Sequence, residues 1–273
     1  MKTSDDLCRA ALEGKPLPLG VIDMHAHMGP LGMFHVPDCD AAAMVKIMDR
    51  TGVIAAATSA NAAWASDMRY GNDMVARAVR DFPGRFLPYC VINPQYTDEA
   101  AGELLRCFDE LGFGMIKVHP AWHGVKLTDK RYELVFEFAA ERRAPILTHT
   151  WIDDPTCSPE LGAEVARRHP EVKFIWGHSG GTDVRPALRE GAGLENVHLE
   201  LCCSWVYAGV VEFMVERVGA ERILFGSDFS FIALPQQLGK VVFADITPAE
   251  KRRILRENAL ALLAAAGIDF SGR

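Results

Sequence analysis

The 273-residue sequence predicts a single (β/α)₈ barrel, the TIM-barrel fold, and three observations lead to that prediction. Short β-branched apolar runs alternate with amphipathic stretches along the chain, which is typical of a parallel sheet covered by helices. Eight such units can be counted, and eight strands close a barrel. The length suits one barrel, and 49% of the residues are hydrophobic, enough to fill a large core.

The eight expected strands are the short, β-branched apolar runs. In chain order they are Gly20–His25, Val53–Ser59, Phe86–Asn93, Gly114–His119, Pro145–His149, Lys173–His178, Val197–Leu201 and Ile223–Ser227.

The eight expected helices are the amphipathic stretches that follow these strands. They are Asp40–Arg50, Asp67–Asp81, Asp98–Leu111, Asp129–Arg143, Pro159–His169, Asp183–Gly191, Tyr207–Gly219 and Thr247–Ala266. Thr247-Pro248-Ala249-Glu250 combines an N-cap, a proline in the first turn and the glutamate of a capping box. Asp129 can cap the fourth helix, and Ser158 followed by proline can start the fifth. We expect residues 1–19 to form an N-terminal arm or an extra helix under the barrel, and residues 20–273 to form one barrel domain.

Composition excludes several classes of protein. The formal net charge is −7 and no dense run of Lys or Arg occurs, which argues against a nucleic-acid partner. Residues 1–20 lack the apolar core of a signal peptide, and the most apolar later stretch, Ala259–Ala266, is too short to span a membrane. The seven cysteines are odd in number and contain no C-x-x-C motif, so we expect reduced core residues instead of disulfides. These features predict a soluble, cytoplasmic protein.

Histidines collect where the expected strands end. In a (β/α)₈ barrel, functional side chains gather at the carboxyl ends of the strands. Five of the nine histidines fall there: His25, His27, His119, His149 and His178. His25 and His27 should point to the same side of their strand, with Ala26 pointing away. Asp228 follows the eighth strand.

This pattern predicts a divalent metal site at the barrel mouth. Two imidazoles on one face, a third from His149 and the carboxylate of Asp228 suit Zn²⁺ or a similar ion, with a position left for water. Such an ion lowers the pKa of its water towards 7. Each residue alone has a simpler explanation: a core histidine, or a helix N-cap in the case of Asp228. Their joint position at the ends of one closed sheet favours the metal.

The same segments resemble a known family. Val21–His27 resembles the first-strand signature of the amidohydrolase superfamily. Other segments are similar to its amidohydrolase-related branch, which includes lactonases, other hydrolases and the aminocarboxymuconate-semialdehyde decarboxylase group. These are Gly114–Pro120, Pro145–Thr150, Gly177–Gly181, Ile223–Asp228 and Glu257–Leu263, in the expected order.

The resemblance implies a role for each matching residue. His25, His27, His149 and Asp228 would bind the metal, and Asp228 would also act as general base. His178 would bind a second metal in a binuclear site, or stand beside a single metal and orient water or stabilise charge. We expect one Zn²⁺, with Mn²⁺ and Fe²⁺ as alternatives and a second metal less favoured.

Lys117 leaves two alternatives open. In binuclear relatives, a lysine on the fourth strand is carboxylated and bridges two metals. In the amidohydrolase-related branch, a lysine at this position is often unmodified. We favour an unmodified Lys117 that holds an anionic substrate group.

Aromatic residues near the strand ends indicate where the substrate binds. His119, Trp122 and His123 follow the fourth strand, and Trp151 follows the fifth. They predict an aromatic-walled pocket for a small cyclic or carboxylated molecule; the alternative is that the tryptophans only pack loops against the rim. The remaining candidates for the pocket are Trp64, Trp205, Glu200, Cys202, Ser204 and His35.

Three functions are compatible with this pattern to different degrees. The leading hypothesis is a metal-dependent hydrolase that cleaves a C–O or C–N bond of a lactone, ester or amide. The alternative is a non-oxidative, metal-dependent decarboxylase of an aromatic or muconate-type acid; the short loops count against it, because such relatives tend to be longer. The third is an inactive ligand-binding barrel, which should lack a metal ligand, although none is missing. A homo-oligomer is compatible with the resemblance.

Overall fold

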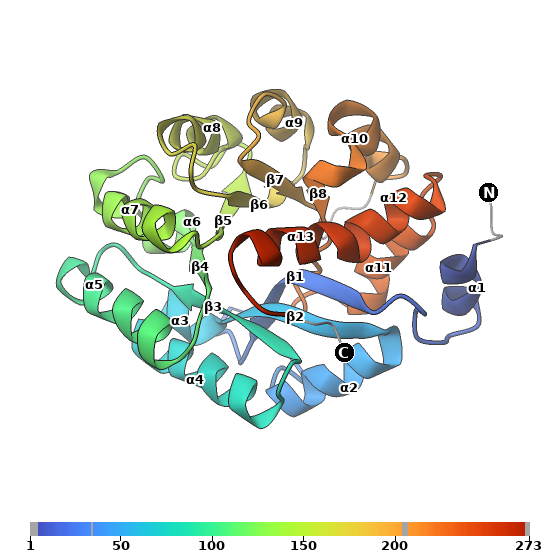
Figure 1. The fold of residues 1–273 in the computed structure, drawn as a ribbon, viewed down its shortest axis with the longest axis horizontal. Coiled ribbons are helices and arrows are strands. Elements are labelled where there is room, and N and C mark those ends of the chain that lie inside the picture. Colours follow the sequence, from blue (N-terminus) through green and yellow to red (C-terminus); the bar gives the residue numbers. More distant parts are fainter. Residues whose placement is uncertain (1–4, 34, 204–206, 271–273) are drawn as a thin grey trace.

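The computed structural model describes residues 5–33, 35–203 and 207–270. Its eight parallel strands form one sheet in the order β1 to β8, with helices packed around the outside (Figure 1). The strands are β1 (Val21–Met28), β2 (Val53–Ala60), β3 (Phe86–Val91), β4 (Met115–Val118), β5 (Ile146–Trp151), β6 (Phe174–Gly180), β7 (Val197–Glu200) and β8 (Ile223–Leu224). The predicted barrel and its eight strands are confirmed.

The helices lie between the strands, as expected, but several loops hold additional short ones. The helices of the first half are α1 (Asp6–Leu12), α2 (Ala41–Thr51), α3 (Asn61–Ala65), α4 (Met68–Asp81), α5 (Thr97–Leu105), η1 (Arg106–Glu110), α6 (Pro120–His123), η2 (Lys130–Tyr132) and α7 (Glu133–Arg142). Those of the second half are α8 (Pro159–Arg168), α9 (Arg185–Gly191), α10 (Val210–Val218), η3 (Ala220–Arg222), α11 (Leu234–Val242), α12 (Pro248–Arg252), η4 (Arg253–Glu257) and α13 (Asn258–Ala265). The capping box at Thr247 is present, whereas Asp129 caps the 3₁₀ turn η2, which forms the start of the expected helix and leads into α7. In the described part of the chain, no helix is long and apolar enough to cross a membrane.

The barrel closes where β1 meets the segment after β8. The backbone N–H of Asp228 donates to the carbonyl of His25 at 2.8 Å, and Ala26 pairs with Phe229 in a parallel bridge. The backbone of Met24 is joined to Phe225 at 2.9 Å in the same seam. Closure therefore brings Asp228 beside the H-x-H segment, although about two hundred residues separate them in the sequence.

Strand β1 departs from simple alternation. Its pairing with β2 shifts register between Asp23 and Ala26. As a result, two consecutive side chains, those of Met24 and His25, both point into the barrel instead of to opposite sides of the strand. Ala26 packs in the outer layer, as expected.

Two apolar layers hold the barrel together. The larger one lies between the strands and the surrounding helices. The smaller one fills the lower barrel and includes Ile22, Met24 and Tyr89 together with Leu262 and Leu263 of α13. Figure 1 shows α13 crossing the centre of the ring of strands. The C-terminal helix thus covers the end of the barrel opposite to the mouth.

The N-terminal helix α1 lies at the side of the barrel. The thiol of Cys8 donates to the carbonyl of Val242 in α11 at 2.9 Å, and Lys251 contacts Asp5 at 2.7 Å. Figure 1 shows α1 outside the ring, near α11 and α12. The end of the barrel opposite to the mouth, one of the two positions expected for residues 1–19, is covered by α13 instead.

Candidate metal centre

The histidines of the H-x-H segment point at each other across the barrel mouth. The Nε2 atoms of His25 and His27 are 3.1 Å apart, and both side chains are buried. The Nδ1 atom of His25 lies 3.0 Å from a carboxylate oxygen of Glu200, and that of His27 lies 3.1 Å from the hydroxyl of Ser59. With the Nδ1 protons held by these partners, both Nε2 lone pairs face the same point.

Asp228 completes this corner of the site. Its Oδ1 atom lies 3.1 Å from Nε2 of His27 and 3.8 Å from Nε2 of His25. Its backbone has a positive φ of 58°, which is uncommon outside glycine and typical of strained functional positions. Burial raises the pKa of Asp228, but the close contact with His27 and the imidazoles of His178 and His25 outweigh burial and hold the pKa low. The carboxylate is therefore ionised and available as a ligand.

A second carboxylate, that of Asp23, holds the segment that carries Asp228 in place. Asp23 accepts hydrogen bonds from the backbone N–H groups of His25 at 3.0 Å and Ser227 at 3.1 Å, and also from the Ser227 hydroxyl. Burial raises the pKa of Asp23 to about 7, against the opposing effect of these hydrogen bonds. Asp23 thus joins β1 to the segment that carries Asp228.

Lys117 reaches the same point from β4. Its Nζ atom lies 3.0 Å from Nε2 of His25, and the side chain is fully buried. Burial lowers the pKa of Lys117 to about 8, although Asp228 and other anions nearby favour the charged form. The amine therefore lies against His25 at the floor of the mouth.

His149 and His178 stand on the other side of the mouth. Their ring centroids are 4.6 Å apart, and the ring of His178 lies 5.1 Å from that of His25. The Nδ1 atom of His149 is buried without a hydrogen-bond partner. His178 has a positive φ of 67°, and its Nδ1 atom lies 3.1 Å from the carbonyl of Cys202.

These donors fit a divalent cation. Burial lowers the pKa values of His25, His27 and His149, so that the rings are neutral and can act as ligands. Two converging lone pairs 3.1 Å apart, an orphaned imidazole nitrogen and an ionised carboxylate are better satisfied by a cation than by one another. The structure brings together all five residues predicted for the metal site.

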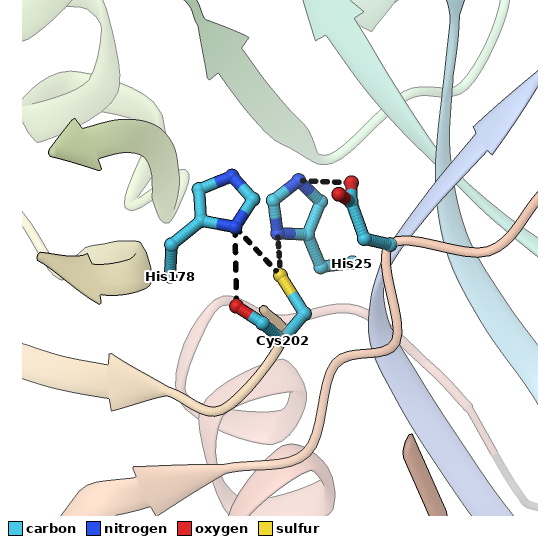
Figure 2. A group of neighbouring side chains, drawn as sticks. His25, His178 and Cys202 are labelled. Carbon is cyan, nitrogen blue, oxygen red and sulfur yellow. Dashed lines mark hydrogen bonds and ion pairs between the residues drawn. The ribbon is translucent and has the colours of Figure 1, made fainter. Parts of the chain in front are cut away.

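Two residues at the end of β7 contribute more than the sequence suggested. Glu200 and Cys202 were expected only to line the pocket. The Cys202 sulfur lies 3.2 Å from Nδ1 of both His25 and His178 (Figure 2), and 2.9 Å from Glu200. The group His25, His178, Cys202 and Asp228 also has ligand atoms within 4.8 Å of one another. The signal available in the sequence was the i, i+2 spacing of Glu200 and Cys202 at a strand end.

Above the donors lies a cavity of about 240 Å³ with aromatic walls. The rings of Trp64, His119, His149 and Trp151 stack in sequence, with centroids 5.1, 4.3 and 5.8 Å apart. Trp122 also lines the cavity and packs edge-on against Trp64. The cavity is lined by His27, Leu31, Met33, Trp64, His119, Trp122, His149, Trp151, His178, Cys203, Asp228 and Phe231.

Not every pocket candidate reaches this cavity. His123 is buried outside it, with its Nδ1 atom 3.2 Å from the hydroxyl of Tyr132. His35 is exposed and does not line it. Phe231, which stacks on His27 at 4.9 Å, was missed because it follows β8 in a segment without a recognisable motif. Ser204 and Trp205 lie outside the described residues.

The profile of the amidohydrolase family matches residues 22–264, which include the strands and the donors described above. The chain belongs to the amidohydrolase family. This membership confirms the resemblance seen in the strand-end motifs.

Two curated relatives of this family member are decarboxylases. It is 25% identical to 2-amino-3-carboxymuconate-6-semialdehyde decarboxylase of Dictyostelium discoideum over 74% of this chain and 66% of that protein, a little under two thirds of its length. It is 24% identical to γ-resorcylate decarboxylase of a Polaromonas species over 79% of this chain and 84% of that protein. A solved Polaromonas dihydroxybenzoic acid decarboxylase with bound manganese and 2-nitroresorcinol shares the fold, with a TM-score of 0.72 and 21% identity over 90% of this chain and 97% of that one.

The prediction of a hydrolase is wrong. The similar proteins are named decarboxylases, which favours the decarboxylase alternative. The physical reason is that the H-x-H pair, the third histidine and the aspartate mark the metal and not the bond that breaks. The short loops are also no argument against a decarboxylase, because the similarity extends over 84% of the Polaromonas enzyme.

Proposed function

We propose that this chain is a metal-dependent, non-oxidative decarboxylase of a small aromatic or muconate-type carboxylic acid. One observation carries the proposal: His27 and Asp228, 3.1 Å apart, line a cavity walled by stacked aromatic rings, and Nε2 of His27 converges there with Nε2 of His25 behind it. The names of the curated relatives support decarboxylation as the reaction.

His25, His27, His149 and Asp228 would hold one divalent cation. When bound, the cation would attract the anionic oxygens of the substrate and neutralise their charge. Histidine and carboxylate donors accept Zn²⁺, Mn²⁺ and Fe²⁺. The manganese in the Polaromonas structure makes Mn²⁺ the first cation to load.

The cavity favours a substrate with one flat ring or an equivalent conjugated chain. Its volume of about 240 Å³ leaves little room beyond a single substituted ring, and Trp64, Trp151 and Phe231 offer faces against which such a ring can stack. No Arg or Lys is among its described lining residues. We therefore assign the carboxylate to the floor of the mouth, where the amine of Lys117 lies 3.0 Å from Nε2 of His25.

Decarboxylation needs a proton at the carbon that loses the carboxyl group. The C–C bond breaks, CO₂ leaves, and the electron pair that remains on carbon takes up one proton. We assign its delivery to His178 in its imidazolium form. The proton on Nδ1 is held by the carbonyl of Cys202, so the proton on the other ring nitrogen, which turns away from Cys202 (Figure 2), is the one transferred, and solvent replaces it. Asp228, with its low pKa, would remain ionised as a ligand and orient the proton donor.

Reaction in D₂O with carboxyl-¹³C-labelled hydroxybenzoates and muconate-type acids tests this function. We expect labelled CO₂ and one deuterium on the carbon that carried the carboxyl group. Hydrolysis of lactones or amides, without CO₂ release from any acid in the panel, would refute the proposal.

A further inference from the structure

Glu200 is a buried carboxylate that contacts both sides of the metal centre. It ends β7 and has no exposed surface. Its Oε2 atom lies 3.0 Å from Nδ1 of His25 and accepts the backbone N–H of His178 at 3.0 Å. The thiol of Cys202 donates to the same oxygen at 2.9 Å.

The barrel leaves space for this carboxylate. A side chain at Gly226 would collide with the carboxyl group of Glu200 and with Cβ of His25. A Cβ atom at Gly177 would come within 3.0 Å of the His25 ring. Strand β6 and the segment after β8 therefore carry glycine where a larger residue would displace Glu200 and His25.

The hydrogen-bond directions then determine which nitrogen of His25 is free. The Oε2 atom of Glu200 already accepts the backbone N–H of His178 and the thiol of Cys202, so it acts as an acceptor and Nδ1 of His25 carries the proton that faces it. Its Nε2 atom is left with a lone pair directed at Nε2 of His27 and at Asp228. Carboxylate partners of this kind fix the tautomer and orientation of histidine ligands.

We propose that Glu200 is a positioning residue that sets the metal affinity of the centre by holding His25 in the Nδ1-protonated form and by fixing the backbone of His178 beside it. The inference rests on the proposed function only in that the centre binds a cation. It concerns binding and requires no particular substrate.

The test compares Glu200→Gln with a matched control, Glu103→Gln. Glu103 is also a buried carboxylate, bound to Asn72 and Arg106, but it lies on α5 away from the mouth. The dissociation constant of Mn²⁺ is measured without substrate by electron paramagnetic resonance. Glu200→Gln should bind Mn²⁺ roughly 10- to 100-fold more weakly, because its amide can donate to Nδ1 and favour the wrong tautomer. Glu103→Gln should stay within about twofold of the wild type.

A wild-type affinity retained in a folded Glu200→Gln protein would overturn the inference. Should that variant not fold, ¹⁵N-histidine spectra of the metal-free wild-type protein decide the question: a proton on Nδ1 of His25 supports the inference, and a proton on Nε2 refutes it. Because neither measurement uses turnover, a protein that binds Mn²⁺ in this way but releases no CO₂ would refute only the proposed reaction.

Discussion

The Nε2 atoms of His25 and His27 lie 3.1 Å apart at the mouth of the barrel, with Oδ1 of Asp228 3.1 Å from the second of them. Neutral imidazoles do not attract each other through two lone pairs, so this approach is explained by a cation that both can bind. Activity should therefore depend on metal binding by His25 and His27.

Replacing His27 with Ala should remove the metal. The variant loses one ligand, the imidazole that lies 3.1 Å from Asp228. We expect Mn²⁺ affinity to fall by well over about 100-fold, since loss of an orienting partner alone costs roughly 10- to 100-fold. Metal content per chain by mass spectrometry measures this, with His198→Gln as a control outside the mouth. Stoichiometric metal in His27→Ala would contradict the assignment.

Lys117 should be unmodified and should act on the substrate. Lys117→Met keeps the length of the buried chain and removes the amine, so we expect KM to rise at least about tenfold, the loss of one good polar contact. The intact mass of the wild-type protein should show no added CO₂ group. Two metals about 3.5–4 Å apart in an anomalous map would instead support a carboxylated bridge.

The stacked rings should determine substrate affinity. Trp151 lies parallel to His149, with an angle of 4° between the rings. Trp151→Ala opens one wall, and we expect KM to rise about tenfold, as for loss of an aromatic partner and its buried area. Tyr96→Ala, at an exposed residue outside the cavity, should leave KM unchanged. Equal KM values for the two variants would show that the tryptophan only packs the rim.

The stability of the protein should fall as acid protonates buried histidines. Burial, together with the smaller effects of Lys173 and Arg222, lowers the pKa of His198 to about 4. Because the pKa in the unfolded chain is about 6.5, the neutral form stabilises the fold above pH 6.5, and this contribution is lost as pH falls from 6.5 towards 4. His198→Gln should therefore show a smaller drop in the urea midpoint between pH 7 and pH 4.5 than the wild type. Identical drops would show that His198 does not contribute.

The sequence predicted the fold well because each barrel unit carries its own local signal. Apolar runs such as Val53–Ser59 and caps such as Thr247 act within a few residues, so their pattern can be read directly. The same holds for His25 and His27, whose spacing of two places them on one face despite the register shift in β1.

The remainder of the site depends on contacts between distant strands. The hydrogen bond from His25 to Glu200 joins residues 175 positions apart, and Phe231 reaches the cavity only because the segment after β8 folds over it. His123 shows the opposite error: it follows β4 as expected, but the short helix α6 turns it towards Tyr132. The reaction was misjudged for a further reason, since one ligand set serves both hydrolysis and decarboxylation.

The central claim is that a metal held by His25, His27, His149 and Asp228 supports decarboxylation. The most direct measurement is CO₂ release from the preferred acid by chelator-treated protein, before and after titration with Mn²⁺. We predict no detectable release from the metal-free protein and full recovery at one equivalent of Mn²⁺ per chain. Undiminished release from protein shown by mass spectrometry to contain no metal would contradict the account.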